Sequence, residues 1–213
     1  MSTNNQNDDS SEEYDVKDDS SEESSDEEDS RDYMPDELTL ENIKSVEKIG
    51  SFSADKIGIG DTDYVKIKLR SGMYNAYQVD DNLMIINKDL NIKPTKKNIT
   101  EWTWKYSKLG VGVDTGMFGF YNIKTVEKIN KLLSEDEYNL LPLIDCKGTT
   151  GEIVTGLLVE DLKKEDKKKF NAFGVIASTG TGDGGFECYT IDDDKAILLG
   201  GYTMNKIANY EDE

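Results

Sequence analysis

Short runs in which hydrophobic and polar residues alternate recur after the first 38 residues, and this period of two predicts β-strands. The pattern is strongest between Trp102 and Tyr121, a stretch that contains both tryptophans of the chain. Trp102, Trp104 and Tyr106 alternate, so their side chains should lie on one face of a strand. We expect a turn at 107–110, a second strand at 111–113 and a third at 117–121.

Strands are predicted on both sides of this stretch as well. Residues 64–69 alternate, and a turn at Ser71-Gly72 should return the chain as residues 73–79 in a hairpin. Apolar residues spaced by three in 38–49 fit either a short helix or an irregular segment. Further strands are expected at 83–86, 170–177, 186–191 and 196–199, with turns at 80–82 and 192–194 and a glycine-rich loop at 178–185.

One amphipathic helix is predicted between Thr125 and Ser134, with Thr125 placed to cap it. Its apolar face should consist of Val126, Ile129, Leu132 and Leu133. The charged run 163–169 that follows later in the chain is expected to form an exposed loop or helix end.

Together these elements predict a mainly β (α+β) fold, either an antiparallel sandwich or a curled sheet with one packed helix. We expect Trp104 in the core, paired across strands with an aromatic residue of 117–121. In the Asp114-Thr115-Gly116 turn, Gly116 should have a positive φ and the Asp114 carboxylate should accept local N–H groups.

Charge divides the chain into three parts. The net charge is −19, and −14 of it lies in residues 1–38, which hold sixteen acidic residues against Lys17 and Arg31. Such a segment cannot bury enough apolar surface to fold alone. We therefore predict a disordered acidic tail at 1–38, one globular domain at 39–206 and a short acidic tail at 207–213.

The acidic tail contains a repeat in which paired serines precede acidic residues. Ser10, Ser20, Ser24 and Ser25 each have an acidic residue three positions downstream, the pattern of acid-directed kinase substrates. Phosphorylation would add further negative charge. The tail is expected to keep the chain soluble or to contact basic protein partners, and it should repel nucleic acids rather than bind them directly.

Several chemistries are disfavoured by composition. The chain has no histidine, and Cys146 and Cys188 are isolated thiols without the spacing of a zinc site or a disulfide framework. We expect no metal and no cofactor. No apolar segment suits a signal peptide or a membrane span, so an intracellular protein is expected. Abundant Asn, Lys and Ile are typical of AT-rich genomes, and an origin in a large DNA virus would allow a place in the virion.

Two motifs resemble a known family. VGVDTGMFGFYN at 111–122 and VIASTGTGDGGFECYTIDDDKAILLGGYT at 175–203 are similar to two blocks of the domain-of-unknown-function family 4241, which is common in bacteria. Weaker matches in the same order extend the resemblance over roughly residues 45–203. It implies a single β-rich domain and assigns no reaction and no role to any residue.

Candidate chemistry rests on carboxylates at glycine-rich turns. Asp114-Thr115-Gly116 is the triplet of aspartic proteases, but a second such triplet is absent and would have to come from a homodimer. The loop 178–185 could cradle a phosphate, and Asp183 or the turn Asp192–Asp194 could bind calcium.

The expected function is a non-catalytic protein-interaction or structural module. The alternatives are a hydrolase-like enzyme of unrecognised type that uses Asp114 and Asp183, or a binder of a small ligand or calcium. The oligomeric state stays open.

Overall fold

The computed structural model describes residues 37–61, 64–133, 141–142, 144–145, 150–179 and 184–201. The tail serines Ser10, Ser20, Ser24 and Ser25, as well as Cys146 and Asp183, lie outside these residues. The division into tail, domain and C-terminal tail stays a prediction, with one correction. Glu37 and Leu38, assigned to the tail from their sequence, belong to the first strand, because Leu38 is buried and pairs with Trp104.

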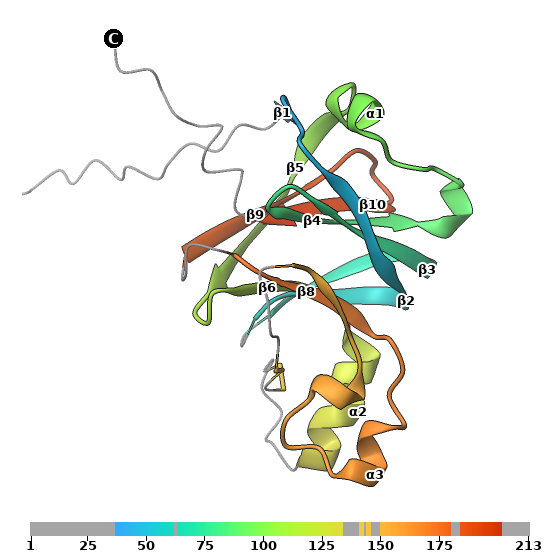
Figure 1. Cartoon of the computed structure of the whole chain (residues 1–213), viewed down its shortest axis with the longest axis vertical. Helices are drawn as coiled ribbons and strands as arrows, with labels where there is room; N and C mark the ends of the chain where they lie inside the picture. Colours follow the sequence, from blue (N-terminus) through green and yellow to red (C-terminus); the bar gives the residue numbers. More distant parts are fainter. Residues whose placement is uncertain are drawn as a thin grey trace, which may run out of the picture. The chain divides into compact units, whose positions relative to one another are not determined.

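Ten strands of the described residues form one antiparallel sheet, and three short helices accompany it (Figure 1). The order across the sheet is β1-β5-β9-β10-β4-β3-β2-β6-β8-β7. The mainly β, antiparallel fold is confirmed in its curled-sheet form. The strands are β1 Glu37–Thr39, β2 Val46–Gly60, β3 Tyr64–Val79, β4 Asn82–Asn87, β5 Thr103–Val113, β6 Met117–Asn122, β7 Glu152–Val154, β8 Gly174–Ser178, β9 Gly184–Thr190 and β10 Ile197–Gly201. The helices are α1 Lys96–Thr100, α2 Ile123–Leu133 and α3 Lys164–Lys167, with single 3-10 turns at Lys88–Leu90 and Gly156–Leu158.

The longest strands, β2 and β3, pair with each other from Val46↔Val79 to Gly60↔Tyr64. The predicted hairpin between 64–69 and 73–79 is wrong, because both segments belong to β3. Ser71-Gly72 lies in a bulge instead: Ala54 pairs with Gly72 and Lys56 with Lys68, so β3 has extra residues here. Gly72 has φ +152°, and glycine serves turns and bulges alike, which explains the error.

The same misreading occurs in β5. The turn expected at 107–110 is absent, and β5 continues as one strand to Val113. Its pairing with β9 shifts between Tyr106 and Gly110, and Lys108 within this bulge has φ +59°. Each bulge bends its strand and increases the local twist. The bulges therefore allow β3 and β5 to follow the curvature of the sheet.

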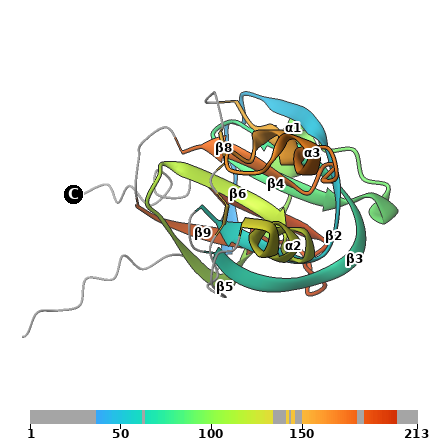
Figure 2. The same ribbon diagram turned by 90° about the horizontal axis from the view of Figure 1, so that it is seen from below.

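The curled sheet is packed on both faces. Its concave face encloses one apolar cluster to which every strand except β1 contributes, eight strands through buried side chains and β7 through the partly buried Ile153. On the outer face, β1, α1 and the segments 40–43 and 90–92 cover a second cluster, and α2 with the segment 154–173 covers a third (Figures 1 and 2). All six residues of β4 are buried because this strand has apolar packing on both faces.

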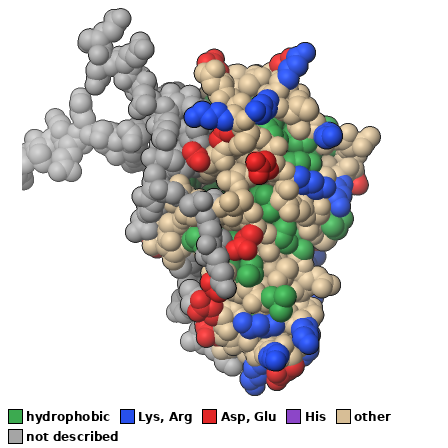
Figure 3. All heavy atoms as spheres, in the orientation of Figure 1, with side chains coloured by type: hydrophobic (Ala, Val, Ile, Leu, Met, Phe, Trp, Pro, Cys, Tyr) green, Lys and Arg blue, Asp and Glu red, His purple; other side chains and the backbone are tan. Residues whose placement is uncertain are grey.

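The predicted helix is confirmed as α2, which begins two residues earlier, at Ile123. Val126 and Ile129 are buried as expected, whereas Leu132 is 49% exposed. Thr125 is the third residue of the helix and is not its cap. The lysine-rich run 163–169 is mostly exposed and contains α3. Figure 3 shows Lys and Arg side chains gathered at the end that carries these two helices. No helix of the described residues is long and apolar enough to cross a membrane.

Trp104 lies in the core, as predicted, with no exposed surface. Its expected pairing with an aromatic residue of 117–121 is wrong. Trp104 on β5 pairs with Leu38 on β1 and packs in the outer cluster that α1 covers. Phe118 and Phe120 lie in the concave cluster instead. Segments adjacent in sequence need not be neighbours in a sheet, and five strands separate β5 from β6.

We predict that Trp104→Ala unfolds the domain or nearly does so. Removing a buried tryptophan leaves a cavity and costs about 3–5 kcal/mol, a large share of the roughly 5–15 kcal/mol that stabilises a typical domain. Trp102, whose ring contacts Trp104 edge-on at 5.6 Å but is only half-buried, is the control. Trp102→Ala should give a clearly smaller loss in urea unfolding, and equal losses would contradict this assignment of the core.

Candidate functional site

The Asp114–Gly116 turn joins β5 to β6, and a distant carboxylate holds it. Asp61 Oδ2 accepts hydrogen bonds from the backbone N–H groups of Asp114 at 2.6 Å and Thr115 at 2.7 Å, and from Thr115 Oγ1 at 3.0 Å. Thr179 donates to the Gly116 carbonyl through both its N–H, at 2.8 Å, and its hydroxyl, at 3.1 Å. The positive φ of Gly116, +67°, is confirmed. The turn is thus tied to β2 and β8 together.

The expected role of the Asp114 carboxylate is wrong. Asp114 is exposed, and the oxygen that accepts the N–H groups of the turn belongs to Asp61, a buried residue 53 positions earlier. The joint role of Asp114 and Asp183 in an enzyme stays a prediction, because Asp183 lies outside the described residues. Sequence reasoning missed Asp61 because its partners are long-range, and the only local signal is its place after Gly60 at a strand end.

We predict that Asp61→Ala destabilises the fold while Asp114→Ala does not. The first variant leaves polar N–H groups without their acceptor, which costs about 1–3 kcal/mol. The second removes an exposed side chain and should stay within about 0.5 kcal/mol. Chemical denaturation of both variants measures the difference. A loss on Asp114→Ala as large as that on Asp61→Ala would show that the Asp114 carboxylate holds the turn after all.

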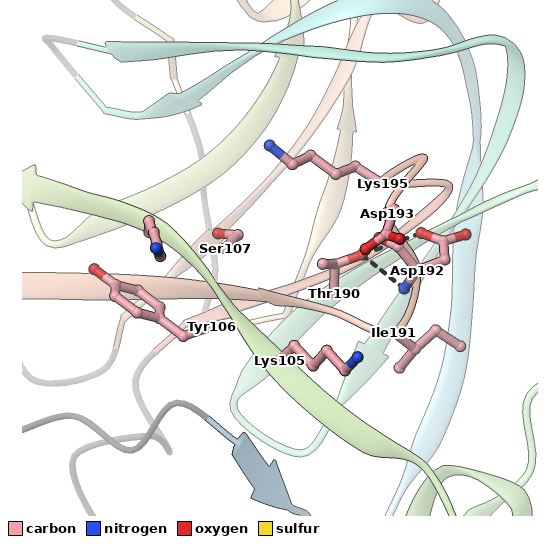
Figure 4. A pocket seen from close by; sticks show the side chains of 9 residues that line it. Lys105, Tyr106, Ser107, Thr190, Ile191, Asp192, Asp193 and Lys195 are labelled. Carbon is pink, nitrogen blue, oxygen red and sulfur yellow. Dashed lines mark hydrogen bonds between the residues drawn. The ribbon is translucent and has the colours of Figure 1, made fainter.

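Lysines surround an open pocket of about 320 Å³ between the β5 bulge and the turn that joins β9 to β10. We call it the lysine pocket. Figure 4 shows Lys105 and Lys195 reaching it from different elements, with Tyr106 at the end away from Asp192 and Asp193. Its lining consists of Lys105, Tyr106, Ser107, Lys108, Thr190, Ile191, Asp192, Asp193 and Lys195.

The turn beside the pocket is held by its own polar groups. Asp192 Oδ1 accepts the N–H of Ala196 at 2.8 Å, and the Thr190 hydroxyl donates to the Ile197 carbonyl at 2.8 Å. Figure 4 shows the hydrogen bonds between Thr190 and Asp192 within the same turn. The turn predicted at 192–194 is therefore confirmed, and its first carboxylate serves the backbone. Among the described residues, no group of three or more acidic or cysteine side chains is placed to hold a metal ion.

Two of the three lysines lie on unusual backbone. Lys108 has φ +59° and Lys195 has φ +52°, a left-handed conformation that is uncommon for residues other than glycine. Lys105 and Lys108 are exposed, and Lys195 is half-buried. None of the three forms an ion pair with a described residue. Three lysines that form no ion pair with a described residue therefore line one pocket, together with Asp192 and Asp193, in a strongly acidic chain.

Beneath the bulge lies a partly buried acid. Glu187 on β9 faces Gly110 and shares a hydrogen bond with Tyr106. Burial raises the pKa of the Glu187 carboxyl above its usual range, and the hydrogen bond with Tyr106 opposes this. Burial and the neighbouring Glu187 raise the pKa of Tyr106 far above its ordinary value. Glu187 Oε2 is buried without a hydrogen-bond partner among the described residues.

The remaining nucleophiles near the pocket are engaged in structure. The Ser107 hydroxyl donates to the Cys188 carbonyl at 2.5 Å across β5 and β9. Cys188 is a fully buried free thiol, as expected, and burial raises its pKa. The hydrogen bond from Ser107 to the Cys188 carbonyl holds the bulge against β9.

We predict that Glu187→Gln raises the melting temperature at pH 7 and has little effect below pH 4.5. The glutamate pKa is raised on folding, so its contribution to stability is fully present below the ordinary value of 4.5 and is lost as the pH rises through the folded pKa. Glutamine removes this loss and keeps an acceptor for Tyr106. Thermal unfolding at pH 4 and pH 7 tests it, with Glu160→Gln, an exposed acid, as the control. An equal effect of Glu187→Gln at both pH values would contradict the burial cost.

Comparison with known proteins returned no matching family model, no matching curated protein and no matching solved structure. The resemblance to family 4241 therefore stays a prediction. Sequence reasoning also missed the lysine pocket. The segment 107–110, which contains Lys108, was predicted to be a turn, and the turn before Lys195 was considered only for its aspartates as calcium ligands. The only local signal was a lysine at each of these irregular sites.

Proposed function

We propose that this chain is a non-catalytic binding module that receives an acidic segment of a partner protein in the lysine pocket. The observation that carries the proposal is that Lys105, Lys108 and Lys195 line one open pocket and form no ion pair with a described residue. Three lysines against Asp192 and Asp193 leave the lining with a net positive charge, which favours a ligand of the opposite sign.

The backbone on which Lys108 and Lys195 lie is held by hydrogen bonds, which supports a role in binding a ligand. Lys195 follows a turn that is fixed by Asp192 and Thr190, and Lys108 lies in a bulge fixed by Ser107. Left-handed backbone at a residue other than glycine persists only where the surrounding structure enforces it, and such positions concentrate at ligand-binding and active sites. A fixed backbone lowers the entropy lost on binding.

A carboxylate-rich peptide suits this pocket better than a nucleic acid does. The net charge of −19 would repel a long polyphosphate backbone, whereas a short acidic segment meets only the local basic surface. Exposed ion pairs contribute about 0–1 kcal/mol each, so binding should be modest and sensitive to salt.

The chemistry of the pocket favours binding over catalysis. The Ser107 hydroxyl donates to a backbone carbonyl, and the raised pKa of Tyr106 keeps its phenol protonated at neutral pH. Asp114, one of the two carboxylates considered for an enzyme, is not among the residues that line the pocket.

We predict that the full chain binds a glutamate-rich peptide and not its glutamine analogue. Fluorescence anisotropy at low and high salt measures the affinity. Lys105→Gln with Lys195→Gln should weaken binding about three- to tenfold, as expected for the loss of two exposed ion pairs. The control is Lys164→Gln with Lys167→Gln on α3, which removes the same charge from another exposed surface.

The proposal fails if the glutamate peptide does not bind, if the glutamine analogue binds equally well, or if both variant pairs weaken binding to the same extent. The last result would indicate a general charge effect and not a site.

A further inference from the structure

A second pocket, lined by two basic and two acidic residues, also borders the turn that joins β9 to β10. Its volume is about 540 Å³, and its lining consists of Lys68, Leu69, Arg70, Asp193 and Asp194. Asp193 also lines the lysine pocket, so the two pockets share this residue. We call the second one the Arg70 pocket.

The basic groups of the Arg70 pocket come from one face of β3. Lys68 and Arg70 are exposed and flank the buried Leu69, as alternation along a strand requires. They lie where β3 bulges away from its register with β2. The Arg70 carbonyl accepts a hydrogen bond from the buried Tyr74 hydroxyl at 2.6 Å, which fixes the backbone beside the guanidinium.

The turn supplies negative charge between the two pockets. The Asp192 carboxylate accepts the Ala196 N–H, whereas Asp193 and Asp194 are exposed. Neither of these two aspartates forms an ion pair with a described residue, and the same holds for Lys68 and Arg70. The order across the two linings is therefore basic, acidic, basic, and among the described residues none of these charges has an ion-pair partner.

We infer that the partner segment carries acidic, basic and acidic residues in that order. One acidic end binds in the lysine pocket, a central Lys or Arg contacts Asp193 and Asp194, and the other acidic end binds Lys68 and Arg70. This inference rests on the proposed function and adds the charge order of the ligand. Complementary charge order gives specificity, because a segment with another order places like charges opposite each other.

The test compares two peptides of identical composition and net charge on the full chain. One has the order Glu-Glu, Lys-Lys, Glu-Glu, and the other joins its four glutamates and places the lysines at one end. Serine spacers of two lengths separate the blocks in each. By isothermal titration, the first peptide should bind about fivefold more tightly at one of the spacer lengths, equivalent to one exposed ion pair of ~1 kcal/mol.

Two variants assign the preference to this surface. Asp193→Asn and Arg70→Gln should each reduce the fivefold preference toward unity. The matched controls Asp161→Asn and Lys48→Gln remove the same charges at exposed positions that line neither pocket, and they should retain it. Circular dichroism of each variant confirms that it is folded.

The outcomes separate this inference from the proposed function. Equal binding of both peptides, still weakened by the Lys105 and Lys195 substitutions, overturns the charge order and leaves the lysine pocket as a binding site. A preference that survives Asp193→Asn and Arg70→Gln also overturns it. Failure of both peptides to bind overturns the proposed function itself.

Discussion

The curl of the sheet depends on register shifts within its long strands. Without a bulge, β2 and β3 would pair as straight strands and could not curve around the core. The extra residues between Lys68 and Gly72 bend β3 where it pairs with β2. A corresponding shift between Tyr106 and Gly110 bends β5 against β9. Because the sheet curls, buried side chains from eight of its ten strands can share one concave core.

The bulges in β3 and β5 also place basic side chains at the two pockets. The β5 bulge supplies Lys108 to the lysine pocket, and the β3 bulge lies beside Arg70 in the second pocket. Bulges leave residues outside the regular ladder and redirect their side chains. The fold and the candidate site thus have a common physical origin, with the turn Asp192–Lys195 between the two pockets.

Long-range hydrogen bonds to carboxylates hold connecting segments whose backbone N–H groups have no partner in the sheet. Asp61 at the end of β2 binds the turn between β5 and β6, and Asp80 similarly accepts the N–H groups of Lys44 and Ser45 before β2 begins. In both cases a carboxylate replaces backbone partners that a turn lacks. These two aspartates therefore have structural roles, and the exposed acids Asp193 and Asp194 remain open to a ligand.

The sequence by itself determined the class of fold, the amphipathic helix, the burial of Trp104 and the positive φ of Gly116, because alternation, helical periodicity and glycine geometry are local properties. It could not distinguish a turn from a bulge at Ser71-Gly72 or at 107–110, since both need the same residues. Only the tertiary structure decided which strands are neighbours, gave Asp61 the role expected of Asp114, and brought Lys105, Lys108 and Lys195 to one pocket. Each of these depends on contacts between residues far apart in the chain, and the pattern within one segment carries no information about its distant partner.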